Sequence, residues 1–255
     1  MIKNIIKAFL LIYLVSSCTS QKQLIYLQDV DSLTTENVYI RQQVDYKIQN
    51  QDILYIRILS IDDRTSDLIN VASSRYQQNL LQNETSLFIN GYSVNNSGNV
   101  ELPVIGKVFV LNKTVEEAKD AIQEKTDQYL RNASVIVKLI SFKFTVLGEV
   151  KRPGVYKNFN NQLTVLEAIG MAGDISDYGN RTRILVIRPT KNETKTFRIN
   201  LTRKDVLSSE GFFLLPNDIV YVEPIKSKTF RINIPTLSLF LTTITTLILV
   251  LNYIK

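Results

Sequence analysis

The feature that most constrains this chain is an uncharged run of residues at its C-terminal end, from Ile232 to Ile254. Arg231 and Lys255 bound the run on its two sides. A helix of this length, rising about 1.5 Å per residue, would reach roughly 34 Å, which exceeds the ~30 Å hydrocarbon core of a membrane. The run therefore predicts one transmembrane helix over residues 232–254, with the folded part of the chain ahead of it.

Polar side chains interrupt this run with a helical period. At 100° per residue, one side of the predicted helix carries mainly hydroxyl and amide groups, and the other carries large apolar groups. A helix with lipid on one side and either neighbouring helices or a water-filled lumen on the other needs such a division. The polar side contains Ser238, Thr242, Thr245 and Asn252, and the apolar side contains Phe240, Ile244, Leu247 and Leu251. The period alone favours helix packing and lumen lining equally.

The N-terminus has the order of a bacterial secretory signal: a stretch with two lysines, an apolar run over 8–15, and small residues before Cys18. The last four residues of this segment, Val-Ser-Ser-Cys, resemble a lipobox, in which the cysteine is lipidated and becomes the first residue of the mature protein. We therefore predict a lipoprotein signal peptide over 1–17, lipidation at Cys18 and a tether over 18–40. An ordinary signal peptide and an uncleaved anchor are the alternatives, although the apolar run is too short to span a membrane.

Composition excludes most enzyme classes. The chain has no histidine and a single cysteine, so it cannot build Ser-His-Asp or Cys-His catalysis, or a zinc or iron site on histidine or clustered cysteine. A nucleotide-binding P-loop is also absent, because Gly106-Lys107 lacks both the earlier glycine and the following Ser or Thr. The net charge of +6 is spread along the chain without a basic run, which argues against nucleic acid. We expect no catalytic residue, no cofactor and no metal, although a carboxylate-only Mg²⁺ or Ca²⁺ site survives these exclusions.

Between the two ends, the sequence pattern indicates an α+β chain with two small β-rich units, over 41–142 and 143–226. Each unit combines strand-like apolar runs with one short helix. A polar stretch over 62–85 is expected to be a long surface loop. The expected strands cover 53–61, 100–104, 107–111 and 135–140 in the first unit, and 142–147, 183–188 and 194–199 in the second.

Two internal echoes favour a duplicated plan. Thr114-Val-Glu-Glu-Ala118 resembles Thr164-Val-Leu-Glu-Ala168, and each segment predicts a capping box that opens a helix. The segment 50–56, Asn-Gln-Asp-Ile-Leu-Tyr-Ile, resembles 216–222, Pro-Asn-Asp-Ile-Val-Tyr-Val. Helix caps and turns favour these residue types in any protein. The short matches can therefore come either from a duplication or from independent selection of the same local structure.

The order of several motifs resembles that of a known family. Segment 46–58, beginning Tyr-Lys-Ile-Gln-Asn-Gln-Asp, and segment 91–106, ending Leu-Pro-Val-Ile-Gly, are similar to the polysaccharide biosynthesis/export domain. Segment 145–156, Thr-Val-Leu-Gly-Glu-Val-Lys-Arg-Pro-Gly-Val-Tyr, and segment 163–174 are similar to a soluble-ligand-binding β-grasp (SLBB) domain. With the lipobox and the terminal helix, the chain resembles the Wza-type outer-membrane lipoproteins that export capsular or extracellular polysaccharide.

This resemblance implies a homo-oligomeric ring, an octamer, whose terminal helices form an α-helical barrel across the outer membrane. It implies that the polar helix side, with Ser238, Thr242, Thr245 and Asn252, faces the lumen and that the apolar side faces lipid. The soluble domains would lie in the periplasm, held at the outer membrane by the lipid on Cys18. They would receive the polysaccharide chain from an inner-membrane co-polymerase. The chain departs from the family pattern in carrying one SLBB unit, where the enterobacterial exporters carry more.

Two other functions fit the same residues. A membrane-anchored structural lipoprotein would use the β-grasp unit to bind a glycan or a protein without forming a pore. An inner-membrane chain-length regulator would need two membrane spans, and the short N-terminal apolar run disfavours the first of them. Closed rings with an axial cavity would favour the export conduit, whereas monomers or dimers would favour the anchored adaptor.

Overall fold

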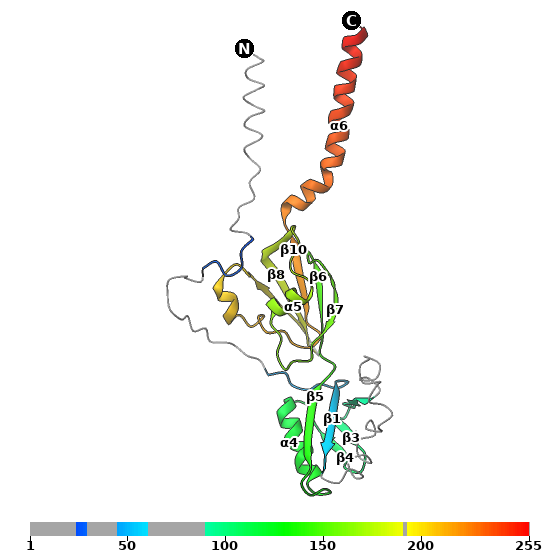
Figure 1. Ribbon diagram of the computed structural model, residues 1–255, viewed down its shortest axis with the longest axis vertical. Helices are drawn as coiled ribbons and strands as arrows, with labels where there is room; N and C mark the ends of the chain where they lie inside the picture. The colour runs from blue at the N-terminus through cyan, green and yellow to red at the C-terminus, as the bar shows by residue number, and fades with distance from the viewer. Residues whose placement is uncertain (1–23, 30–44, 61–89, 191–192, 255) are drawn as a thin grey trace.

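The computed structural model describes residues 24–29, 45–60, 90–190 and 193–254. These residues form an α+β fold with two separate hydrophobic cores and a long C-terminal helix, which confirms the predicted mixed class. In Figure 1 the two β-rich parts lie one below the other, and the C-terminal helix extends from the upper one. The predicted signal peptide and Cys18 lie outside the described residues.

The first β-rich part combines a three-stranded sheet, a hairpin and one helix. Its elements are β1 (Ile53–Leu59), β2 (Tyr92–Ser93), β3 (Asn99–Leu102), β4 (Gly106–Phe109), α4 (Val115–Thr126) and β5 (Ser134–Leu139). The sheet has the order β2-β1-β5 with antiparallel pairs, and β3 and β4 form the hairpin. Alternate residues of β1 are buried, which is the period-2 burial of a strand with one face on a core. α4 packs on β5 and buries Ala118 and Ile122.

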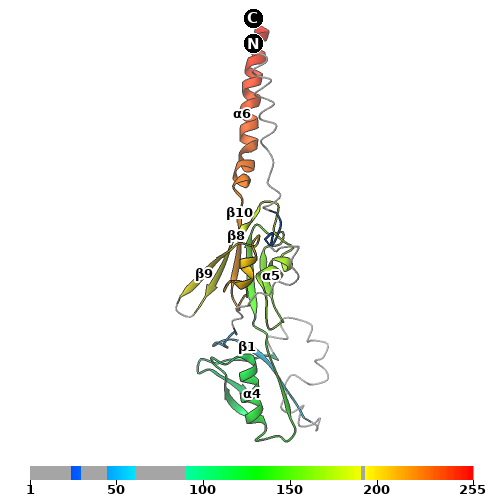
Figure 2. The same cartoon turned by 90° about the vertical axis from the view of Figure 1, so that its left-hand side faces the viewer.

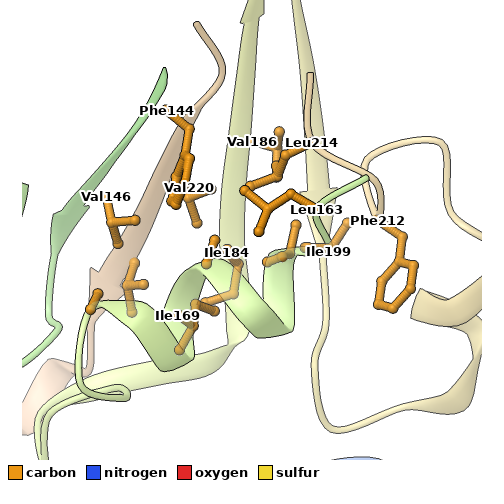
Figure 3. Close-up of a cluster of buried hydrophobic side chains, with 14 of the residues drawn as sticks. Phe144, Val146, Leu163, Ile169, Ile184, Val186, Ile199, Phe212, Leu214 and Val220 are labelled. Atoms are coloured by element: carbon orange, nitrogen blue, oxygen red, sulfur yellow. The ribbon is translucent and has the colours of Figure 1, made fainter. Parts of the chain in front are cut away.

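The second β-rich part is a five-stranded mixed sheet with a short helix on it. Its elements are β6 (Lys143–Gly148), β7 (Gly154–Lys157), α5 (Val165–Met171), β8 (Gly179–Pro189), β9 (Thr194–Ile199), the 3-10 helix η2 (Lys204–Ser208) and β10 (Ile219–Pro224). The strand order is β7-β6-β10-β8-β9, and β10 runs parallel to β6 but antiparallel to β8. Figure 3 shows side chains of β6, β8 and β10 meeting Ile169 of α5 in the core.

Both short helices begin where the capping boxes predict. At α4, the Glu117 backbone N–H donates to Thr114 Oγ1 at 3.1 Å, and the Thr114 N–H donates to Glu117 Oε2 at 2.6 Å. At α5, the corresponding distances between Thr164 and Glu167 are 3.2 and 2.7 Å. Each box satisfies two N–H groups that a helix start otherwise leaves without a partner. The helix starts are therefore confirmed predictions.

The strands agree with the prediction less closely. β8 is longer than the expected 183–188, because its first residues, Gly-Asn-Arg-Thr, are polar and carry no apolar period. Their burial nevertheless alternates, and Gly179 and Arg181 are buried. β2 is absent from the expected strands because its two residues give no readable period, and β7 is absent because it begins at Gly154, directly after Pro153, among residues typical of a turn.

The terminal run is helical, in α6 (Lys226–Ile254). Among the residues that the structure describes, however, no helix combines the length and the apolar character that crossing a membrane demands. The prediction of a transmembrane helix over 232–254 is therefore not supported.

Figure 2 shows the same order of parts from the side, with α4 and β1 at one end of the molecule and α6 at the other. The two β-rich parts bury separate sets of side chains, and Leu139 at the end of β5 packs against both cores. The chain crosses from one part to the other through residues 140–142, between β5 and β6. This crossing places the ends of β1, β5, β6 and β7 close to the junction.

Candidate functional site

The two echoed segments fold into similar turns, and each buries an aspartate just before a strand. Asp52 precedes β1 and Asp218 precedes β10, and their exposed fractions are 7% and 0%. In each turn the carboxylate accepts the backbone N–H of the residue three positions earlier, from Gln49 at 2.9 Å and from Leu215 at 2.8 Å. The residue before each aspartate has a positive φ, 70° in one turn and 69° in the other. The sequence echo therefore corresponds to a shared local structure.

Asp52 lies at the junction of the two β-rich parts, and its described partners are uncharged. Its Oδ2 also accepts from the Tyr46 hydroxyl at 2.8 Å, and its Oδ1 accepts from the Ser141 hydroxyl at 3.1 Å. Ser141 belongs to the segment that crosses between the two parts, and its hydroxyl accepts the Ile53 N–H at 3.2 Å. Burial raises the pKa of Asp52, although the hydrogen bonds from Gln49, Tyr46 and Ser141 oppose that rise. Asp52 thus connects the start of β1 to the crossing segment.

Asp218 has a charged partner instead. Arg188 Nη2 donates to Asp218 Oδ2 at 2.8 Å, and Arg188 Nε lies 3.1 Å from both carboxylate oxygens. The guanidinium also donates to the Phe213 carbonyl at 2.8 Å and lies 5.0 Å from the centroid of the Phe197 ring. Burial raises the pKa of Asp218, although Arg188 and the Leu215 N–H oppose that rise. This buried ion pair ties β8 and β10 to the loop before β10.

Two cavities flank the junction, and Tyr46 lines both. The larger one, of about 450 Å³, lies between the Asp52 turn and the adjoining ends of β6 and β7, and we call it the junction cleft. The smaller one, of about 340 Å³, lies between the start of α4 and residues 160–163 and 213–215. Both volumes fall in the range of roughly 300–1,000 Å³ that ligand sites occupy. The junction cleft is lined by residues 49–53, 140–141, Tyr46, Lys143, Lys157, Phe159 and Asn217.

The root of α6 is fixed to the second β-rich part by Glu149, which belongs to the turn after β6. Glu149 Oε1 pairs with the ammonium group of Lys228, and its Oε2 accepts from the Ser176 hydroxyl at 2.8 Å. The backbone N–H of Ile225 donates to the Tyr178 carbonyl at 2.8 Å. The hydrogen bond from Lys228 is the largest cause that lowers the pKa of Glu149. These contacts set the direction in which α6 leaves the domain.

Both predicted faces of α6 are exposed in the single chain. On the apolar side, Phe240, Leu247 and Leu251 are 61–63% exposed and Ile244 is 39% exposed. The polar-side residues Ser238, Thr242, Thr245 and Asn252 are exposed as well. The threonine hydroxyls donate within the helix, for example from Thr242 to the Ser238 carbonyl at 2.8 Å. The lumen and lipid faces therefore stay predictions.

A short N-terminal segment docks on the second β-rich part. The backbone N–H of Leu27 donates to the Leu201 carbonyl at 3.0 Å, and that of Gln28 donates to the Thr202 carbonyl at 2.8 Å. The Tyr26 hydroxyl donates to Asp174, and the guanidinium of Arg181 lies 5.3 Å from the centroid of the Tyr26 ring. Burial is the main cause that raises the pKa of Tyr26. No local sequence pattern indicates this docking, because the residues that the segment contacts lie more than a hundred positions away.

In the described parts of the chain, no cluster of three or more His, Cys, Asp or Glu side chains could hold a metal ion. The sequence analysis did not identify Asp52 and Asp218 as the residues that hold their turns, or Glu149 as the residue that fixes the start of α6. The repeated Asn-Asp and Gln-Asp turns were the available signal for the two aspartates, because the turn chemistry is local. The long-range partners Arg188 and Lys228 had no such signal.

Two family models match the chain. Residues 41–140 match the model of the polysaccharide biosynthesis/export protein, and residues 142–222 match the SLBB domain. The first match covers β1 to β5, and the second runs from β6 into β10. The chain therefore contains an export domain followed by an SLBB domain, which confirms the resemblance seen in the sequence.

Curated relatives match about half of the chain. The EPS I polysaccharide export outer membrane protein EpsA of Ralstonia nicotianae is 28% identical over 139 residues, which are 53% of this chain and 36% of that protein. The protein of the same name from Ralstonia solanacearum is 29% identical over 138 residues, 52% of this chain and 36% of that protein. The matched region thus spans about a third of the length of each relative. Both names describe a transport role rather than an enzymatic one.

Proposed function

The chain contains a polysaccharide biosynthesis/export domain followed by an SLBB domain, and we propose from this that it is a subunit of an outer-membrane exporter of capsular or extracellular polysaccharide. The observation that carries the proposal is this order of domains, which leads directly into an exposed apolar helix. The soluble domains would lie in the periplasm, with Cys18 lipidated at the outer membrane. An inner-membrane co-polymerase would supply the polysaccharide.

The exposed surface of α6 supports assembly into a homo-oligomeric ring. Large side chains such as Leu239, Leu247 and Leu249 are 66%, 63% and 69% exposed in the single chain. Large apolar side chains left this exposed on one helix mark contact with a partner or with lipid. In the proposed ring, the α6 helices of neighbouring copies lie side by side. The side with Ser238, Thr242, Thr245 and Asn252 faces the lumen, and the side with Phe240, Ile244, Leu247 and Leu251 faces outward.

A second candidate function is a membrane-anchored lipoprotein that binds a glycan or a protein and forms no pore. The junction cleft favours this alternative, because a binding role needs a cleft whereas a conduit needs a lumen. The two functions differ in whether several copies enclose a continuous path. They also differ in whether polysaccharide reaches the cell surface without α6.

The first test is genetic. A strain that lacks the protein is complemented with the full chain or with a variant that ends at Ile225, which keeps both domains and removes all of α6. The full chain should restore surface polysaccharide, and the shortened variant should not, although immunoblots show equal amounts of both. A Cys18→Ser variant tests the lipid anchor separately, by loss of acyl labelling.

The second test is assembly. The detergent-extracted full chain is imaged by electron microscopy beside the variant that ends at Ile225. Closed rings with an axial cavity, lost in the shortened variant, are the expected result. Monomers or dimers of the folded full chain, together with normal surface polysaccharide from the shortened variant, would overturn the conduit in favour of the anchored adaptor.

A further inference from the structure

We propose that the junction cleft binds a short stretch of an acidic polysaccharide, with Lys143 and Lys157 holding a sugar carboxylate and Phe159 packing against a sugar ring. The inference rests on the proposed export function, because it names the chemistry of the chain in transit. The cleft is built from the Asp52 turn of the export domain and from strand ends of the SLBB domain, so both domains would contact the ligand.

The arrangement of the two lysines is the first argument. In the antiparallel pair of β6 and β7, Lys143 lies directly opposite Lys157, which places both side chains on the same face of the sheet. A carboxylate bound between them would make charge-assisted contacts with both ammonium groups.

The one carboxylate among the described residues that line the cleft cannot take that place. Asp52 is 7% exposed, and its two oxygens already accept hydrogen bonds from Gln49, Tyr46 and Ser141 at 2.8–3.1 Å. Asp52 therefore forms part of the wall of the cleft, and with Lys143 and Lys157 it leaves the described lining with a net positive charge. This charge favours an anionic ligand over a cation or a neutral apolar molecule.

Polar and aromatic groups in the cleft fit a sugar rather than a simple anion. Side-chain amides offer donors and acceptors together, which matches the hydroxyl groups of a sugar. The Asn50 Oδ1 is buried and has no hydrogen-bond partner among the described residues, so it can accept from a ligand hydroxyl. Phe159 is 63% exposed and presents an apolar surface to a ring. The amides that line the cleft belong to Gln49, Asn50, Gln51 and Asn217.

The proposed export role limits how strongly the junction cleft can bind the polysaccharide. A conduit has to bind its cargo strongly enough to admit it and weakly enough to release it. Two partly exposed lysines and an exposed ring can supply such a contact, because charge-assisted contacts near solvent are weak and screened by salt. We therefore expect a millimolar dissociation constant that rises with ionic strength.

Saturation-transfer NMR on the full chain in detergent micelles tests the inference. The probes are trigalacturonate as the acidic saccharide, maltotriose as the neutral one and inorganic phosphate as a simple anion. Trigalacturonate should bind at least about tenfold more tightly than maltotriose, as the loss of hydrogen bonds to a charged group implies. An equal concentration of phosphate should not displace it.

Matched variants locate the binding. The double variant Lys143→Gln/Lys157→Gln should raise the dissociation constant for trigalacturonate about tenfold or more. The control Lys119→Gln/Lys195→Gln removes two exposed lysines elsewhere and should leave it unchanged. Phe159→Ala should weaken binding, whereas Phe109→Ala, at an exposed phenylalanine of β4, should not. Circular dichroism verifies that all four variants fold.

The outcomes separate this inference from the proposed function. Equal binding of maltotriose, displacement by phosphate, or unchanged binding by the cleft variants would overturn the cleft inference alone. Normal surface polysaccharide in the deletion strain, with trigalacturonate still bound in the cleft, would overturn the export function and leave a glycan-binding lipoprotein. Loss of binding in the cleft variants, with intact control variants, supports the cleft as the site.

Discussion

Removal of one partner from the Arg188–Asp218 pair should destabilise the SLBB domain and leave the export domain unchanged. Asp218 is fully buried and Arg188 is 7% exposed, so Asp218→Leu leaves a guanidinium in the core with the Phe213 carbonyl as its one remaining acceptor among the described residues. It also removes the acceptor of the Leu215 N–H. A buried charge left without its partner costs about 3–5 kcal/mol. An exposed ion pair would contribute only about 0–1 kcal/mol.

Hydrogen exchange with mass spectrometry measures this cost in each domain of the same molecule. Each 1.4 kcal/mol corresponds to about tenfold, so amides of β8 and β10 should exchange about two to three and a half powers of ten faster in Asp218→Leu. Amides of β1 and β5 provide the internal control, because they belong to the other core. Their exchange should not change.

A double-mutant cycle separates the ion pair from simple loss of packing. Arg188→Met should also be strongly destabilising, because it leaves the Asp218 carboxylate without its cation. The double variant Arg188→Met/Asp218→Leu should cost no more than the milder single variant, since no charge is then left in the core. Single effects below about 1 kcal/mol, or a double effect equal to the sum of the singles, would refute the reasoning.

Three further predictions concern single positions. Gly148→Ala should lower the thermal midpoint of the SLBB domain, because Gly148 has φ +86° and an added Cβ would lie 2.2 Å from the Val222 carbonyl oxygen of β10. The control Gly170→Ala, where an added Cβ meets nothing within 4 Å, should be neutral or stabilising by up to about 1 kcal/mol; equal effects would contradict this explanation. Glu149→Gln should speed hydrogen exchange at the root of α6 at neutral pH. The pKa of Glu149 is lowered in the folded protein. The ionised Glu149 therefore stabilises the wild-type protein fully above the ordinary glutamate pKa of about 4.3, and this stabilisation is lost as the pH falls through the folded pKa. The exchange rates of the wild type and of Glu149→Gln should therefore become equal only at acid pH. Thr242→Glu should preserve ring assembly and Ile244→Glu should abolish it in electron micrographs; equal tolerance of both would refute the assignment of faces.

The features that could be predicted from the sequence are those built from neighbours in the chain. The capping boxes of Thr114 and Thr164 act over three residues, and so do the turns of Asp52 and Asp218. Their residue types and spacing are therefore visible without the fold. The two matched families confirm that the order of these motifs was read correctly.

The candidate site could not be predicted in the same way, because its contacts join distant segments. Ser141 reaches Asp52 across 89 residues, and Lys228 reaches Glu149 across 79. The facing lysines of the junction cleft become neighbours only when β6 pairs with β7. In the sequence these residues belong to polar turns and strand ends, which carry no period to indicate a partner.

The threonines of α6 explain why a polar stripe does not identify its own environment. The Thr242 hydroxyl donates to the Ser238 carbonyl, and the Thr246 hydroxyl donates to the Thr242 carbonyl, both at 2.8 Å. A hydroxyl whose donor is satisfied inside its helix can lie against apolar groups, a neighbouring helix or water at little cost. A glutamate has no such partner within the helix, so its carboxylate needs water or a cation nearby. Comparing Thr242→Glu with Ile244→Glu therefore tests the environment of each face, whereas a threonine-to-valine exchange would test only the hydrogen bond.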